Sequence, residues 1–191
     1  MKQIANYINE KLHVTLKSHA YSCHPTTKDE LQKIIIQRIK YEDNECNLND
    51  IDVSNITDMS YLFNSNVYWG SGNNIFKDFN GDISNWDVSN VTNMRGMFND
   101  CKEFNCDISD WDVSNVKDMG FMFFECEKFN CNISKWDVSN VEYMERMFTW
   151  CKNFNCDLSE WDVSNVKKMG YAFFKCPTQP KWYDKNKYET R

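Results

Sequence analysis

The sequence predicts an α/β repeat solenoid, in which short repeats stack as successive coils. The pentapeptide Trp-Asp-Val-Ser-Asn begins at Trp86, Trp111, Trp136 and Trp161, at a constant spacing of 25 residues. A unit of that length is too short to bury a core of its own, so neighbouring units must stack on one another. The same apolar residues recur at the same positions of every unit, which predicts one core shared along the stack.

The repeats define the domain boundaries. Full units run over 79–103, 104–128, 129–153 and 154–178, and a divergent unit carries Asp52-Val53-Ser54-Asn55. The step from Asp52 to Asp87 is longer than one repeat, so we expect an insertion near 66–74, where Gly70 and Gly72 are typical of a turn. We therefore expect an N-terminal helical cap over 1–45, a repeat solenoid of about five coils over 46–178, and a polar C-terminal tail over 179–191.

Each coil is predicted to contain one short parallel strand and one short helix or helical turn. Alternating apolar residues over 108–113 favour a strand. The apolar residues that follow, from Val116 through Met119 to Cys126, are spaced by three or four, which favours helical turns facing inward. The Asp-Val-Ser-Asn segment between them has the short polar side chains of a turn.

The two ends of the chain do not repeat. Thr27 and Glu30 form a predicted capping box, and five apolar residues supply one face of the helix that follows (Leu31, Ile34, Ile35, Ile36 and Ile39). A second short helix is expected around Ile4–Leu12. Pro177 and Pro180 end the repeat, and the polar residues after them are typical of a tail with little order.

The repeat FNxDISxWDVSNVxxMxxMFxxC resembles the short repeats of the BspA-like leucine-rich-repeat family. The MFxxC segment is similar to the AFxxC segment of that group, and Thr27–Lys40 and Leu48–Phe63 resemble the segments that precede its repeats. The resemblance implies a leucine-rich-repeat-like solenoid that binds other macromolecules, without enzymatic activity or catalytic residues. Many members of that family are surface proteins.

The cysteines favour a reducing compartment. Seven of the nine form two columns in the repeats: Cys101, Cys126, Cys151 and Cys176, and Cys106, Cys131 and Cys156. Cysteines fixed by a repeat are typical of small buried core residues. A disulfide ladder and a metal site remain as alternatives, although the odd total and a spacing unlike CxxC argue against both.

Charge and motif content exclude several functions. The net charge is −6, and the acidic excess lies in the repeats, which disfavours direct nucleic-acid binding. The cluster of His19, Cys23 and His24 fits no standard zinc spacing, and one aspartate per coil suits a turn better than calcium. We expect no enzyme, no cofactor and no metal. The absence of an apolar leader or a membrane span predicts a cytoplasmic protein. We also expect a monomer.

The variable positions of the repeat predict where a partner binds. Inward positions are nearly constant, whereas the intervening positions vary and are rich in aromatic residues and arginine, which interface centres favour. We call these residues the aromatic face: Phe121, Phe124, Tyr143, Arg146, Trp150, Tyr171 and Phe174. The alternative is that some of these rings pack between coils as additional core.

The sequence therefore predicts a non-enzymatic protein–protein interaction module that binds an unidentified protein through this face. A partner with a basic surface would fit the acidic body. A second hypothesis is an inhibitor, encoded by a phage or mobile element, that blocks a nucleic-acid-handling machine such as a defence nuclease with its acidic body.

Overall fold

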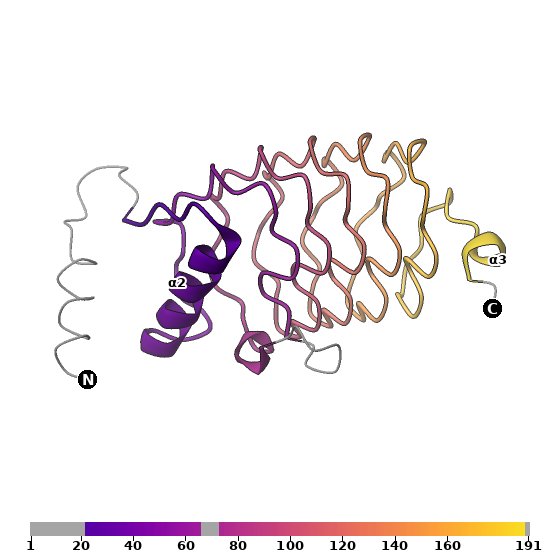
Figure 1. Cartoon of the computed structure of the whole chain (residues 1–191). Helices are drawn as coiled ribbons and strands as arrows, with labels where there is room; N and C mark the ends of the chain where they lie inside the picture. The colour runs from indigo at the N-terminus through magenta and orange to yellow at the C-terminus, as the bar shows by residue number, and fades with distance from the viewer. Residues whose placement is uncertain (1–21, 66–72, 190–191) are drawn as a thin grey trace, which may run out of the picture.

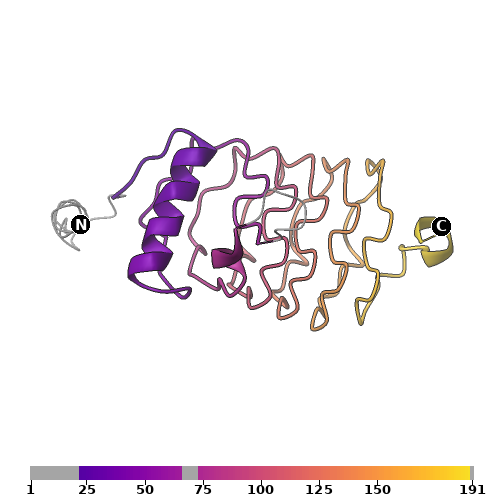
Figure 2. The same cartoon turned by 60° about the horizontal axis from the view of Figure 1, so that its bottom comes forward.

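The computed structural model describes residues 22–65 and 73–189. The chain winds into coils that lie side by side along one axis, from the indigo N-terminal side to the yellow C-terminal side (Figure 1). Helix α2 (Lys28–Tyr41) lies against the first coils, and helix α3 (Lys185–Tyr188) lies at the opposite end, as a second view also shows (Figure 2). Most of the predicted insertion lies outside the described residues, which resume just before the 3-10 helix η2 (Asn74–Phe76).

Successive coils are held in parallel register by single-residue bridges. Asp58 pairs with Asn93, and the same column continues through Asp118 and Tyr143 to Lys168. After the first step, each bridge joins residues one repeat apart, so residues at the same repeat position lie next to each other. We use the word column for such a set. The bridges are isolated, and no strand is assigned in the described residues.

Within residues 79–178, no strand or helix is assigned, and consecutive turns occupy the positions predicted for a short helix or helical turn. Over residues 94–101, the N–H groups of Met94, Gly96, Phe98 and Asp100 each donate to a carbonyl of the next coil, whereas alternate N–H groups close turns within the coil. A helix requires every N–H to bond within its own segment. Because half of them bond the neighbouring coil, the period of three to four comes from consecutive turns. The predicted strand at 108–113 is likewise a turn, closed by Trp111 N–H on the Ile108 carbonyl.

Two columns of phenylalanine rings fill the core. Phe123 stacks on Phe98 at 5.7 Å and on Phe148 at 5.6 Å between ring centroids, and it lies 3.9 Å from Phe129 of the second column. The ring planes are nearly parallel, so each coil repeats the packing of the coil before it. Burying such a ring contributes about 1.5–3 kcal/mol, so this double column contributes strongly to the stability of the stack.

Side chains of the repeated motif form hydrogen bonds between coils and within turns. The indole Nε1 of Trp111 donates to the Ile83 carbonyl at 3.2 Å, and Asn115 Nδ2 donates to the Ser89 carbonyl at 2.8 Å. Asp112 accepts hydrogen bonds from the N–H and hydroxyl of Ser114 within its own turn. The repeated motif therefore encodes both the turn and the contact that fixes the next coil.

Helix α2 caps the N-terminal end of the stack. Thr27 is its N-cap and accepts a hydrogen bond from the Glu30 N–H, whereas the Glu30 carboxylate accepts from Thr26. Leu31, Ile35 and Ile39 are buried against the first coils. Ile34 and Ile36 are partly buried and also pack against the core.

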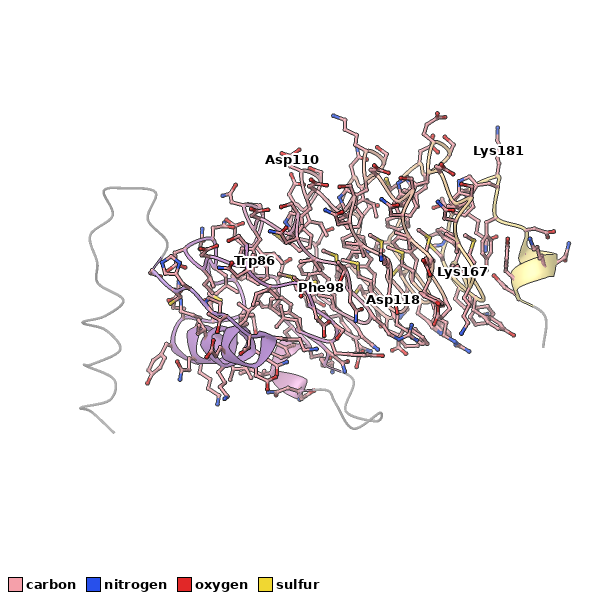
Figure 3. The ribbon with its side chains drawn as sticks, turned by 45° about the horizontal axis from the view of Figure 1, so that its top comes forward. Trp86, Phe98, Asp110, Asp118, Lys167 and Lys181 are labelled. Atoms are coloured by element: carbon pink, nitrogen blue, oxygen red, sulfur yellow. The ribbon has the colours of Figure 1, made fainter. Side chains whose placement is uncertain are left out.

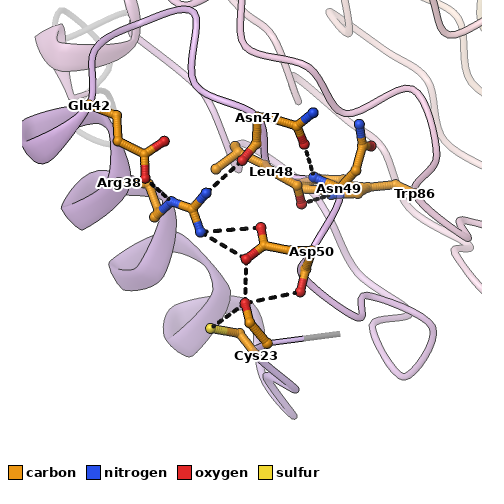
Figure 4. Close-up of polar contacts among 9 residues, drawn as sticks. Cys23, Arg38, Glu42, Asn47, Leu48, Asn49, Asp50 and Trp86 are labelled. Atoms are coloured by element: carbon orange, nitrogen blue, oxygen red, sulfur yellow. Dashed lines mark hydrogen bonds and ion pairs between the residues drawn. The ribbon is translucent and has the colours of Figure 1, made fainter. Parts of the chain in front are cut away.

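Arg38 anchors α2 to the first coil. Its guanidinium donates to both oxygens of Asp50 and to the Asn47 carbonyl, and it also pairs with Glu42 (Figure 4). Burial opposes its charge, but the hydrogen bonds and charges of Asp50 and Glu42 raise the pKa of Arg38. The predicted second helix around Ile4–Leu12 lies outside the described residues.

The C-terminal segment closes the other end, which the sequence did not predict. Trp182 Nε1 donates to the Leu158 carbonyl at 2.8 Å, as the repeat tryptophans do to their preceding coils. Tyr183 is buried, and its ring lies 5.0 Å from that of Phe173. Residues 181–189 are polar in composition, but these two aromatic residues cover the last coil.

All nine cysteines are free thiols in the structure. Cys101, Cys126 and Cys151 are buried, and each donates through Sγ to a carbonyl of the preceding coil at 2.9 Å. Burial raises the pKa of these three thiols well above the ordinary value. They pack as core residues.

Candidate interaction surface

The aromatic face lies on the turns of each coil that run from the residue before its inward methionine to the residue before its inward cysteine. Tyr143 belongs to the bridged column, and Phe121, Arg146 and Tyr171 share another column. The remaining members occupy two further columns within the same turns. Figure 3 shows Asp118, a member of the bridged column, away from Asp110 and Lys181, which lie along another edge of the stack.

Left-handed backbone conformations occur at two positions of every full turn. Phe121, Arg146 and Tyr171 have φ values of 60°, 55° and 59°, and Trp150 and Lys175 have values of 66° and 60°. Non-glycine residues pay on the order of 1–2 kcal/mol for this conformation. The hydrogen bonds to the next coil compensate for it, because Phe121 N–H donates to the Glu145 carbonyl and Arg146 N–H to the Gly170 carbonyl.

The rings of the face are paired with cations. The Arg95 guanidinium lies 4.9 Å from the Phe121 ring centroid, and Arg146 lies 4.9 Å from that of Tyr171. Such contacts contribute about 0.5–1 kcal/mol at exposed sites. The face is therefore a mixed surface of rings and cations.

Exposure differs across the predicted residues. Trp150 is 40 % exposed, whereas most of the others are half-buried. Phe124 is 7 % exposed and packs against Phe121 at 5.8 Å. The prediction that Phe124 faces outward is wrong, because its side chain is buried, as is that of Thr149 at the same position one coil later. Phe174, in the last coil, is half-buried. Phe124 is buried against Phe121 at the edge of the face, and it does not belong to the hydrophobic core cluster of the described residues.

Arg95 is a site residue that sequence reasoning missed. Its Nη1 lies 2.7 Å from Glu145 Oε1 and 3.4 Å from Asp118. A Cβ on Gly120 would lie 2.5 Å from this nitrogen, so a side chain at this position would displace the Arg95 guanidinium from its path across the intervening coil. One feature of the sequence could have indicated this contact. Arg95, Gly120 and Glu145 occupy the same position of three successive repeats, so the glycine stands between an arginine and a carboxylate.

The Arg95 cluster is partly buried, which shifts its titration. Although burial opposes the charge of Arg95, its hydrogen bond and ion pair with Glu145 raise its pKa. Burial raises the pKa of Asp118, and the nearby Glu145 charge adds to this effect, while Arg95 and the Gly120 N–H lower it. The cluster fixes the N-terminal part of the face and leaves it acidic.

A second ion-pair cluster lies nearby. Lys102 lies within 3.5–3.8 Å of Asp100, Glu125 and Glu127, and Lys152 pairs with Glu127 at 2.7 Å. Burial raises the pKa of Glu125, and the neighbouring carboxylates add to this. The acidic side chains of this half of the face outnumber its cations.

The four full repeats match a family whose description is "Mycoplasma protein of unknown function, DUF285", over residues 70–185. The chain belongs to this family. The family match spans the aromatic face, the Phe columns and the start of α3, whereas α2 and the first coil precede it. The family description names no activity, so no residue role carries over from it. Neither the curated proteins nor the solved structures provide a match.

The described residues of this family member contain no arrangement of side chains suited to a metal ion. Within residues 22–65 and 73–189, no group of three or more His, Cys, Asp or Glu side chains is placed to hold a metal ion. His24 instead contacts Asp52 at 3.0 Å, and His19 lies outside the described residues. The repeated aspartates accept hydrogen bonds within their own turns, as Asp112 does from the Ser114 N–H.

Shallow grooves run between coils along another edge. One, of about 360 Å³, is lined by amides, carboxylates and a thiol (Asn105, Asp107, Ser109, Asp110, Cys131, Asn132 and Lys135). Its open, polar shape gives it no catalytic arrangement.

Among the described residues, no helix has the length and apolar content to cross a membrane.

Proposed function

We propose that this chain is a non-enzymatic protein-binding module that binds its partner through the aromatic face. Trp150 carries this proposal. Within the described residues, Trp150 and Tyr41 of α2 are the exposed large hydrophobic side chains, and Trp150 lies among other rings and cations. Partly exposed tryptophan beside arginine is the composition that interface centres favour.

The module is proposed to be a BspA-like leucine-rich-repeat protein. The repeat motif supports this, and so do the parallel register of the coils and the inward Met and Phe columns. We also propose that it acts in a reducing compartment such as the cytoplasm. Buried thiols that donate to backbone carbonyls support that placement, because a disulfide would remove those donors.

A capture experiment tests the binding proposal. Tagged wild-type protein and the Trp150→Ala variant would each be used as bait in a lysate of the native host, followed by quantitative mass spectrometry. The matched control is Tyr41→Ala, which removes the other exposed ring from the helical cap. We expect a protein retained by the wild type and by Tyr41→Ala to be lost with Trp150→Ala. Equal retention by all three baits would refute the role of the aromatic face.

One observation favours the second candidate, an inhibitor that presents an acidic body to a basic nucleic-acid channel. Asp87, Asp112, Asp137 and Asp162 are exposed and stack in one column. Replacing Asp112 and Asp137 by Asn removes charge but keeps an oxygen that can accept the turn hydrogen bond. Loss of partner capture in this double variant, but not in Trp150→Ala, would support the inhibitor over the aromatic face.

A further inference from the structure

Charge changes sign along the aromatic face. In the bridged column, Asp118 is followed by Tyr143 and then by Lys168. A second column runs in the same order, from Glu125 through Trp150 to Lys175. The Glu125 N–H donates to the Thr149 carbonyl and the Trp150 N–H to the Phe174 carbonyl, which are the residues just before the next members of the column. Each column therefore passes from a carboxylate through an aromatic ring to a lysine.

The lysine end contains a continuous group of rings and cations, which we call the C-terminal patch (Arg146, Trp150, Tyr171, Phe174 and Lys175). Arg146 lies over the Tyr171 ring, and Tyr171 lies 5.7 Å from Phe174. Lys175 Nζ lies 5.6 Å from the Phe174 centroid and 5.9 Å from that of Trp150. Two cations therefore bracket three rings.

The cations of this patch differ from those at the other end of the face. Arg95 and Lys102 are paired with carboxylates. Over residues 22–65 and 73–189, no ion pair involves Arg146, Lys168 or Lys175. On a chain with a net charge of −6, unpaired cations beside a partly exposed tryptophan form a local site for negative charge.

We propose that the C-terminal patch binds an acidic segment of a partner protein, with carboxylates at Arg146 and Lys175 and an apolar side chain against Trp150. This inference rests on the proposed function and specifies the partner's chemistry. The overall composition predicted a partner with a basic surface, whereas the partner segment proposed for this patch is acidic. Asp118 and Glu125 repel carboxylates one coil earlier, so they limit the acidic segment to the last two coils and orient it along the stack.

The patch could in principle serve nucleic acid, because rings and cations also bind single strands. Protein is favoured because the adjoining coil presents Asp118 and Glu125, and a phosphate backbone extending along the stack would meet both carboxylates. A protein segment can change its charge from one residue to the next, whereas a phosphate backbone cannot.

Three probes test the proposal by fluorescence anisotropy: a labelled peptide with glutamates on both sides of one phenylalanine, the same peptide with lysines for glutamates, and single-stranded oligouridylate. We expect the acidic peptide to bind wild-type protein and the lysine peptide not to bind. Lys175→Glu should weaken acidic-peptide binding by about tenfold or more. The matched control is Lys135→Glu, which makes the same charge change at an exposed lysine on the groove edge and should leave affinity within about twofold.

Trp150→Ala should also weaken the acidic peptide, and circular dichroism of each variant would show that it remains folded. The inference is overturned if the acidic peptide does not bind, if Lys175→Glu and Lys135→Glu have equal effects, or if the lysine peptide or oligouridylate binds more tightly at this patch. Any of these results, combined with a host protein captured by wild type and lost with Trp150→Ala, would refute the acidic-segment inference while leaving the proposed function intact.

Discussion

Arg95 and Glu145 form an ion pair at 2.7 Å although 50 residues separate them in the chain. The pair spans a complete intervening coil, whose Gly120 leaves room for the arginine side chain. Most contacts in a repeat stack join adjacent coils. This pair joins coils that are two repeats apart, and it thereby links three successive coils in the acidic half of the aromatic face.

Arg95→Met should destabilise the protein by about 1–3 kcal/mol, because it leaves Glu145 and Asp118 partly buried without their cation. The free energy of unfolding would be measured by urea titration. Gly120→Ala should also destabilise, since the new Cβ displaces the guanidinium. In the Arg95→Met background, Gly120→Ala should have little further effect. Additive losses would show that the two residues act independently and that the crossing is not the reason for the glycine.

Phe123→Ala should reduce the free energy of unfolding by about 3–5 kcal/mol, since it removes a ring that stacks on four neighbouring phenylalanine rings. Phe121→Ala, two residues earlier in the same turn, is the matched control, and it should reduce stability less because that ring is half-buried on the face. Thermal and urea unfolding would compare the two variants. Equal losses would contradict the assignment of the inward and outward columns.

The repeat sequence predicted which side chains form the core but not the backbone conformation that places them. Met119 and Phe123, assigned inward from their constancy, have no exposed surface. The same spacing was interpreted as helical, because apolar periodicity reports which side a residue faces and contains no information on where its N–H group bonds. The alternating bonds to the next coil become visible only when two coils lie side by side.

The candidate site was predicted in part, for a related reason. Variability between repeats located the turns of the aromatic face, and Trp150 is exposed there. Variability between repeats could not show that the Phe124 side chain is buried. It also could not show that arginine side chains lie over the rings of the face. Arg95 was missed because its partners lie in other repeats, so no local motif contains them. Contacts between columns depend on packing along the stack, which a single repeat does not encode.

Acid should destabilise the protein through its turn aspartates. Hydrogen bonds from Ser114 lower the pKa of Asp112, and Ser54 and Ser164 do the same for Asp52 and Asp162. A carboxylate with a lowered folded-state pKa contributes stability above its unfolded pKa of about 3.9, and that contribution disappears as the pH falls through the folded value. Melting temperatures should therefore decrease below about pH 4.

The control for this acid effect is Ser114→Ala, which should raise the pKa of Asp112 toward its ordinary value and reduce the acid dependence of the melting temperature. Asp118 should contribute with the opposite sign, since its raised pKa favours the folded state at low pH and loses that effect as the pH rises. Asp118→Asn should therefore be less destabilising at neutral pH than at pH about 3. A larger loss at neutral pH would contradict the direction of the Asp118 shift.

The thiols should react in an order set by burial. Cys101, Cys126 and Cys151 are fully buried with strongly raised pKa values, whereas Cys106 and Cys156 are half-buried. Alkylation at mildly alkaline pH, followed by peptide mass spectrometry, should label the second group first and the buried three only after unfolding. Nine alkylatable thiols are expected in denatured, non-reduced protein. Disulfide-linked peptides between coils would refute both the core role and the proposed reducing compartment.

The last prediction concerns the C-terminal end of the stack. Trp182 and Tyr183 cover Phe173, and the Tyr188 carbonyl accepts the Tyr171 N–H that has no further coil to bond. Trp182→Ala should destabilise the last coil by about 2–4 kcal/mol, because it removes a ring and a hydrogen bond to the Leu158 carbonyl. Hydrogen exchange should increase at 158–178 and remain unchanged at the coils next to α2, since repeat stacks can lose structure from one end. Lys181→Ala, at the neighbouring exposed residue, should leave exchange unchanged. If Trp182→Ala accelerates exchange uniformly along the stack, the coils unfold as one cooperative unit and the segment after residue 178 is not a local cap.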